Sequence, residues 1–189
     1  MLNVVIFGAP GSGKGTQSEL IIRKYELKHI STGEILRTEI KKRSELGLLA
    51  DEYISKGQLV PDEVIIGMLE TILNESKDVK GFIFDGFPRT LTQGEALDRM
   101  LREKDTSVAV VLNLSVEGKE LVQRLLKRGE ILGRSDDNPE TIWSRLDVYH
   151  NQTEPLKEYY KKQGKLVTIK GDTVEDVFEK ITDMLNRIL

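Results

Sequence analysis

The residues best suited to chemistry lie near the start of the chain, where residues 8–16 have the sequence GAPGSGKGT. This stretch nearly matches the pattern G-x-x-x-x-G-K-[ST], in which glycines let consecutive backbone N–H groups converge on a phosphate. Lys14 would add a positive charge for the outer phosphates, and the N-terminus of the following helix would favour an anion. Gly15 occupies the place of the usual metal-binding hydroxyl. The sequence predicts a phosphate-binding loop with an altered metal contact.

Two other interpretations of these glycines are weaker. A glycine-rich turn between a strand and a helix needs no ligand, but here strand, loop, lysine and helix follow one another as a phosphate loop requires. A dinucleotide-binding loop requires G-x-G-x-x-G, and Thr16 stands where its last glycine should be. The phosphate-binding interpretation is therefore favoured.

Apolar runs separated by helical patterns indicate the elements that hold this loop. Short buried strands are expected at residues 3–7, 28–30, 81–85, 107–114 and 166–169, and helices at 14–25, 48–56, 62–74 and 174–188. Ser31 precedes Glu34 with the spacing of a helix N-cap, and Pro155 should kink or split a helix that starts near Pro139.

This alternation predicts an α/β fold, a three-layer sandwich around a central parallel sheet of five strands. Ligands of such sheets bind outside the carboxyl ends of the strands, where the glycine loop begins. Asp85 ends one predicted strand and could hold Mg²⁺ directly or through water, although by itself it could equally cap a turn. Residues 31–60 and 128–139 lack core strands, so we interpret them as insertions over the strand ends.

Arginines gather near the second insertion. Arg124 and Arg128 are four residues apart on a predicted helix, Arg134 lies within the insertion, and Arg145 follows on the next helix. A single arginine is most often a solvated surface residue, which is our interpretation of Arg99 and Arg102. Several arginines near a phosphate loop instead indicate stabilisation of charge on phosphates.

Composition limits the class of protein. The chain has 189 residues, a net charge of −3 and no cysteine. We expect a soluble cytoplasmic protein without disulfides, because no targeting or membrane-spanning stretch is visible. The charge balance gives no indication of a nucleic-acid or membrane partner.

Several strings together resemble the adenylate kinase family: GAPGSGKGT, STGEILR at 31–37, KGQLVPD at 56–62, GFIFDGFPRT at 81–90, GRSDD at 133–137 and TEPL at 153–156. The resemblance covers essentially the whole chain. It implies reversible transfer of a phosphoryl group from ATP to AMP with Mg²⁺, giving two ADP. It also implies a P-loop core at 1–30, 61–127 and 140–189, an NMP-binding insertion at 31–60, a short lid at 128–139, and a monomer.

The resemblance assigns roles to particular residues. Those implied in catalysis are Lys14, Asp85, Arg89, Arg128, Arg134 and Arg145. Those implied in ATP binding are Gly11, Ser12, Gly13, Lys14, Gly15, Thr16, Arg124, Arg128 and Gly171. Those implied in AMP binding are Thr32, Gly33, Arg37, Gln58, Leu59, Val60, Gly86, Phe87, Arg89, Gln93, Arg134 and Arg145.

The same resemblance also implies the identity of the acceptor nucleotide and the way in which the metal is bound. Thr32 and Gln93 match positions that favour adenine, where the similar UMP/CMP kinases usually carry alanine and asparagine. A glutamine amide can both donate to and accept from the adenine edge. The short lid has no cysteine, which excludes a four-ligand zinc site. We expect Mg²⁺ to be held mainly by phosphates and water, with Asp85 in contact through water.

No general base is needed, because the phosphate oxygen of AMP is already ionised at neutral pH. We therefore expect His29 and His150 to be structural. Two other classes of protein carry such a loop: a P-loop GTPase, which would normally show N-K-x-D, and an ATPase module serving a partner. No asparagine begins N-K-x-D, and motifs spanning the chain leave little room for a partner surface.

Overall fold

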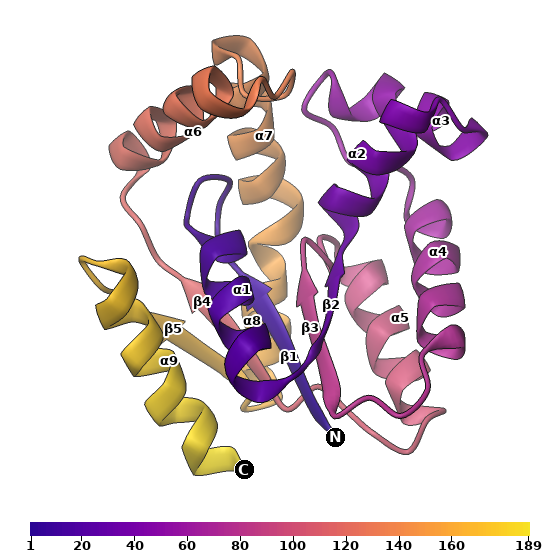
Figure 1. Ribbon diagram of the computed structural model, residues 1–189, viewed down its shortest axis with the longest axis vertical. Helices are drawn as coiled ribbons and strands as arrows, with labels where there is room; N and C mark the ends of the chain where they lie inside the picture. The colour runs from indigo at the N-terminus through magenta and orange to yellow at the C-terminus, as the bar shows by residue number, and fades with distance from the viewer.

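The sheet of the computed structural model, which describes residues 1–189, has five parallel strands (Figure 1). They are β1 (Leu2–Phe7), β2 (Lys28–Ser31), β3 (Gly81–Asp85), β4 (Val110–Leu114) and β5 (Leu166–Ile169), in the order β2-β3-β1-β4-β5. In the centre, Val4 of β1 is paired with Ile83 of β3 on one side and with Val110 of β4 on the other. The prediction of a parallel five-stranded sheet is confirmed.

Helices cover both faces of this sheet because its side chains alternate between two apolar clusters. Val4 and Ile6 face α1 (Lys14–Tyr25) and α9 (Val174–Ile188), where Ile21 and Ile181 are fully buried. Val5 and Phe7 face the opposite cluster, which is completed by α4 (Asp62–Glu75), α5 (Leu91–Arg102) and α8 (Pro155–Lys162). The predicted three-layer sandwich is therefore observed.

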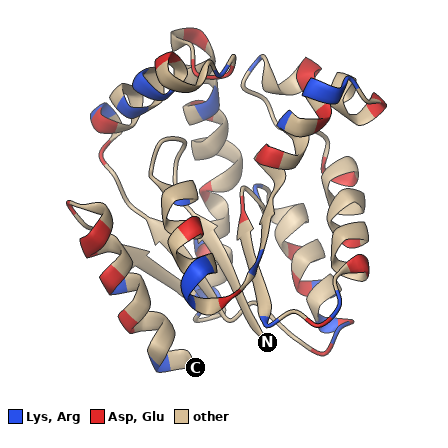
Figure 2. Cartoon of the chain, viewed as in Figure 1, with Lys and Arg blue, Asp and Glu red and all other residues tan.

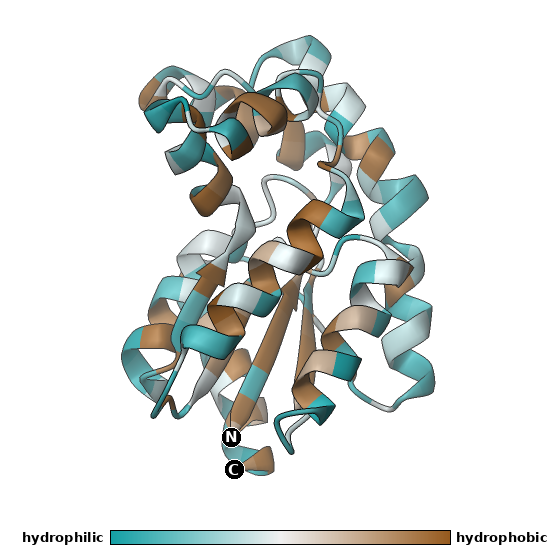
Figure 3. Cartoon of the chain, turned by 90° about the vertical axis from the view of Figure 1, so that its right-hand side faces the viewer, coloured by the Kyte–Doolittle hydropathy of each residue, from teal (hydrophilic) through white to brown (hydrophobic).

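Charge and hydropathy follow the same layers. Lys, Arg, Asp and Glu lie mainly on the helices and at strand ends (Figure 2), whereas apolar residues fill the strands and the inner helix faces (Figure 3). No helix has the length and apolar character needed to cross a membrane.

Two helical regions rise beyond the carboxyl ends of the strands (Figure 1). One contains α2 (Thr32–Lys42) and α3 (Glu45–Ile54), and the other contains the end of α6 (Gly118–Leu132) and the start of α7 (Pro139–Val148). The predicted cap is present, since Ser31 Oγ accepts a hydrogen bond from Glu34 N at 3.4 Å. A π-helical turn at Tyr149–Thr153 separates α7 from α8, as the position of Pro155 predicted.

Two boundaries differ by three residues from the sequence-based expectation, more than any other. β4 begins at Val110 and not at residue 107, because the side chain of Asn3 bonds to Thr106 Oγ1 and to the Ser107 carbonyl, each at 3.0 Å, in place of a regular ladder. α3 begins at Glu45 and not at residue 48, because Ser44 caps it by accepting from Gly47 N at 3.0 Å.

Candidate active site

The glycine loop connects the central strand β1 to α1 and opens toward the two helical regions (Figure 1). Gly13 immediately precedes α1 with φ of 91°, a conformation that residues with a Cβ rarely adopt. No side chain caps this helix, so its first N–H groups face the cavity described below. The loop thus offers the unpaired donors and the helix dipole that an anion requires.

A cavity of about 540 Å³ lies over this loop. Its wall combines the loop, the end of β3, α2, α6, α7 and the connection from β5 to α9. The basic residues that line it are Lys14, Arg37, Arg89, Arg124, Arg128, Arg134 and Arg145. The acidic residues in the same wall are Glu19, Glu34, Asp85 and Asp172. Although the whole chain carries a net charge of −3, this cavity has an excess of positive charge.

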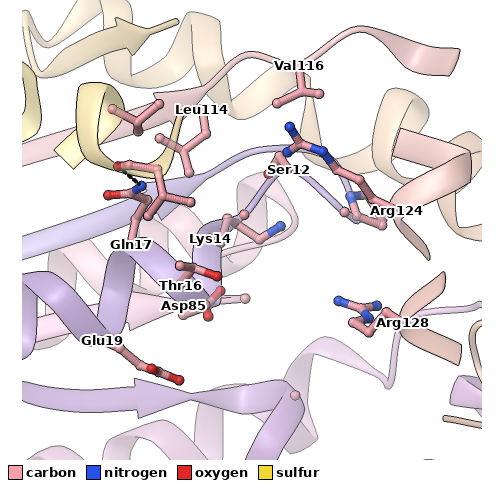
Figure 4. A pocket seen from close by; sticks show the side chains of 18 of the residues that line it. Ser12, Lys14, Thr16, Gln17, Glu19, Asp85, Leu114, Val116, Arg124 and Arg128 are labelled. Atoms are coloured by element: carbon pink, nitrogen blue, oxygen red, sulfur yellow. Dashed lines mark hydrogen bonds between the residues drawn. The ribbon is translucent and has the colours of Figure 1, made fainter. Parts of the chain in front are cut away.

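Lys14 occupies the centre of this arrangement (Figure 4). Its Nζ donates to the carbonyl oxygens of Gly8 at 2.8 Å and of Ala9 at 3.1 Å, which leaves one of the three ammonium protons for a ligand. Burial lowers the pKa of Lys14 to about 8; Asp85 opposes this shift and nearby arginines add to it. A bound anion would relieve this cost.

The arginines repel one another as well. Burial, and then the charge of Arg145, lower the pKa of Arg89 to about 10. Burial also lowers the pKa of Arg37 and Arg134, and the charge of Arg128 contributes to both shifts. These groups stay protonated at neutral pH, so the cavity holds like charges at an electrostatic cost that a polyanion would offset.

Two buried carboxylates hold part of this positive charge in place. Asp137 accepts two hydrogen bonds from Arg128, at 2.6 and 2.8 Å, and one from Arg145 at 2.6 Å. Arg145 also pairs with Asp136 at 2.9 Å. Burial alone would raise the pKa of Asp137, but the bonds and charges of both arginines bring it below its usual value. The adjacent acids are visible in GRSDD, but no local pattern there assigns them a role.

A smaller cavity of about 60 Å³ adjoins the first beneath α2. Its lining includes Thr32, Gly33, Gln58, Leu59, Val60 and Gln93, all of which the family resemblance implies in AMP binding. Arg37, Gly86, Arg89 and Arg145 line both cavities. Thr32 Oγ1 donates to the Gly86 carbonyl at 2.8 Å, and Arg89 Nε donates to the same oxygen at 2.8 Å.

The structure brings nearly all of the predicted site residues to these two cavities. Of those assigned to the donor nucleotide or to catalysis, the large cavity is lined by Gly11, Ser12, Gly13, Lys14, Gly15, Thr16, Asp85, Arg89, Arg124, Arg128, Arg134, Arg145 and Gly171. Phe87 is the exception: it lines neither cavity and is 1% exposed within the apolar core. His29 and His150 also lie outside both.

Sequence reasoning missed some residues of the site. Gln17 Nε2 donates to the Val174 carbonyl at 3.0 Å and so links α1 to the start of α9 at the cavity wall (Figure 4). Asp62 Oδ1 accepts a hydrogen bond from Gln93 Nε2, 31 residues later in the sequence. Neither pairing has a local sequence pattern that would reveal it.

The two helical regions over the cavity contact each other directly. Ser144 Oγ of α7 donates to the Lys56 carbonyl at 2.8 Å, and Thr141 Oγ1 donates to the Ser55 carbonyl at 3.3 Å. A Cβ at Gly57 would lie 2.9 Å from the Thr141 carbonyl oxygen, so only glycine permits this approach. The predicted lid boundary at residue 128 falls inside α6, which continues to Leu132.

The residues present fit a magnesium ion brought in by a nucleotide. Asp85 supplies one hard carboxylate at the end of β3, in the same wall as Lys14 and Thr16. No group of three or more His, Cys, Asp or Glu is arranged to hold a metal. Protein ligands alone would therefore be too few, and phosphates and water would have to supply the others.

Comparison with known proteins agrees with this geometry. The family model described as adenylate kinase matches residues 6–165. An adenylate kinase of Parabacteroides distasonis is 61% identical over 189 residues, covering all of both chains. One from Azobacteroides pseudotrichonymphae is 57% identical and covers 100% of this chain and 99% of its own. One from Bacteroides fragilis is 57% identical over 182 residues, 96% of each chain. With this fold, this cavity and these matches, the chain belongs to the adenylate kinase family, whose members transfer a phosphoryl group reversibly between ATP and AMP.

Proposed function

We propose that the two cavities divide the substrates, with ATP phosphates on the glycine loop and AMP in the smaller cavity beneath α2. The observation that supports this most strongly is the group of cations where the cavities meet. Arg89 and Arg145 line both cavities, so each can reach phosphates of either nucleotide. A transferring phosphoryl group would pass between these side chains.

On the donor side, the N–H groups from Gly11 to Thr16 cradle the outer phosphates, and Lys14 adds its free ammonium proton. Arg124 and Gly171 line the same cavity and would contact the nucleoside of ATP. A Cβ at Gly15 would meet no protein atom within 4 Å, so the space beside this residue is open to a ligand.

On the acceptor side, Arg37 and Arg89 bind the AMP phosphate. A guanidinium group can bind two phosphate oxygens in a fixed orientation. Gln93 and Thr32 face the adenine, and the segment Gln58–Val60 lines its pocket. Because the attacking phosphate oxygen is already ionised, the reaction needs no base, and neither histidine takes part.

Catalysis then depends on positioning and on charge. Arg128, Arg134 and Arg145 contact the transferring group from the lid side and stabilise its charge. Mg²⁺ bound with ATP supplies further neutralisation of the phosphates, and Asp85 would hold it through water. The lid at residues 128–139 closes over the phosphates and excludes water, with Gly133, at φ of 61°, as a pivot.

We also propose that the protein works as a monomer in the cytoplasm, without zinc and without a nucleic-acid or membrane partner. Residues of one chain line both cavities, so the site needs no second copy. The absence of cysteine suits a reducing compartment and leaves the lid without zinc ligands. Acting there, the enzyme would balance adenine nucleotides and salvage AMP.

The replacement Lys14→Met tests the role of the loop. It removes the ammonium group and keeps a side chain of similar length, so kcat for ADP formation should fall by about 10²-fold or more. The matched control is Lys119→Met on the exposed side of α6, which should retain wild-type kcat. Circular dichroism and thermal unfolding serve to check that both variants fold. Near-normal turnover in folded Lys14→Met would contradict the proposed role.

A further inference from the structure

The side-chain amide of Gln93 is held at both ends. Its Nε2 donates to Asp62 Oδ1 at 2.8 Å, and its Oε1 accepts from the backbone N–H of Arg89 at 2.8 Å. The residue is 2% exposed and lines the smaller cavity. A backbone N–H can only donate and a carboxylate can only accept, so these partners specify which end of the amide is oxygen and which is nitrogen.

Asp62 is placed for this contact by the neighbouring starts of two helices. It is the first residue of α4, which runs beside α5, the helix that carries Gln93 (Figure 1). Its second oxygen, Oδ2, accepts from Thr90 Oγ1 at 2.9 Å, and Thr90 Oγ1 in turn accepts from Gln93 N at 3.2 Å. With both oxygens engaged, the carboxylate has a fixed orientation.

This arrangement leaves Gln93 with one proton on Nε2 and one lone pair on Oε1 for a ligand. A 6-aminopurine has an acceptor, N1, beside a donor, the 6-amino group, and can pair with both. A 6-oxopurine presents the reverse pattern, with a protonated N1 beside the 6-oxygen. To bind it, the amide would have to rotate, which would set Oε1 against the Asp62 carboxylate and the NH₂ group against Arg89 N–H.

We propose that Asp62 is a positioning residue for acceptor selectivity: by fixing the amide of Gln93, it favours 6-aminopurine over 6-oxopurine monophosphates. This inference rests on the proposed role of Gln93 in contacting the acceptor base. A glutamine without this partner would rotate more readily to suit either base. The Asp62 carboxylate therefore makes the Gln93 amide, which can both donate and accept, selective for a 6-aminopurine.

The test compares AMP with IMP, which differ at position 6 and N1, as acceptors with Mg-ATP as donor. The variant Asp62→Leu removes the carboxylate but keeps the size of the side chain, and Asp62→Ala removes it without adding apolar bulk. In both, the ratio of kcat/KM for AMP to that for IMP should fall by about tenfold or more, because the loss of a charged acceptor lowers the cost of rotation. The same change should appear in the ratio of the two Kd values without ATP.

Two controls separate positioning from structural support. Asp62→Asn keeps the size and the hydrogen-bonding capacity of the side chain, but its amide can turn so that its NH₂ group donates to a rotated Gln93 Oε1 while its oxygen still accepts from Thr90 Oγ1. The AMP/IMP ratio should therefore fall although the hydrogen bonds between the two helix starts are kept, a result that structural support alone would not give. Glu63→Leu removes an exposed carboxylate from the same first turn of α4 and should leave the ratio unchanged. Thermal unfolding identifies any variant that fails to fold. If Asp62→Leu does not fold, the AMP/IMP ratio of Asp62→Ala is used to test the inference.

An unchanged ratio in a folded Asp62 variant would overturn the inference, even if both activities fell together, because that result indicates structural support alone. An equal fall in Glu63→Leu would overturn it too, because the helix terminus and not the Gln93 contact would then be responsible. Failure of the underlying function is distinguishable: in that case the wild-type enzyme itself would not prefer AMP to IMP.

Discussion

The two arginines that pair with Asp137 predict a specific loss of stability in Asp137→Asn. Asp137 has no exposed side-chain surface, and it accepts three short hydrogen bonds from Arg128 and Arg145. An asparagine would turn an NH₂ group toward guanidinium donors and leave the two cations underneutralised. A fully buried pair loses about 3–5 kcal/mol when one partner is removed. Since the arginine side chains are 29% and 17% exposed, we expect a smaller loss of about 2–3 kcal/mol.

For a chain of this length, each 1 kcal/mol shifts Tm by about 2–4 °C, so Tm should fall by about 4–12 °C. Circular dichroism reports the whole chain, and the fluorescence of Trp143, the one tryptophan, reports α7. The matched control is Glu120→Gln, which disrupts an exposed pair with Arg124 on the same helix and should cost less than about 1 kcal/mol. Equal shifts in the two variants, or a Tm within about 2 °C of wild type for Asp137→Asn, would refute this reasoning.

Two further predictions concern the charged cavity. The pKa of Lys14 is lowered to about 8 in the free protein, and a bound phosphate would raise it again. At about pH 8.5 the phosphates of ATP are already ionised. ATP binding at that pH should therefore be accompanied by uptake of a fraction of a proton by Lys14. Calorimetry in two buffers of different ionisation enthalpy measures this uptake, which Lys14→Met should abolish; a binding enthalpy independent of buffer would contradict it. Arg89→Lys keeps the charge but cannot form the bidentate hydrogen bonds to two phosphate oxygens, so kcat/KM for AMP should fall by about 10- to 100-fold. A loss under about twofold would show that charge alone suffices.

The features that sequence predicted well depend on local order. A buried parallel strand must be apolar on both faces, which made Val4 to Phe7 recognisable, and a phosphate loop must follow it directly. The cap at Ser31 and the break before Pro155 are also properties of a few consecutive residues. The cations of the large cavity could be predicted, although they are far apart in the sequence, because the family resemblance covers the whole chain.

The features that sequence missed depend on contacts between distant segments. Asp62 and Gln93 are brought together only by the packing of α4 beside α5. The late start of β4 follows from the side chain of Asn3, which is remote in sequence. Phe87 lies in a string that resembles the family, yet its side chain belongs to the core. Local patterns contain none of this information.

The central claim, that the cavity beneath α2 selects AMP, is tested most directly by measuring kcat/KM for AMP, UMP, CMP and GMP with Mg-ATP as the donor. The amide of Gln93 and the hydroxyl of Thr32 lie at this cavity, with hydrogen-bonding capacity suited to adenine. AMP should therefore exceed each of the other acceptors by at least about tenfold. A preference for UMP or CMP would contradict the account.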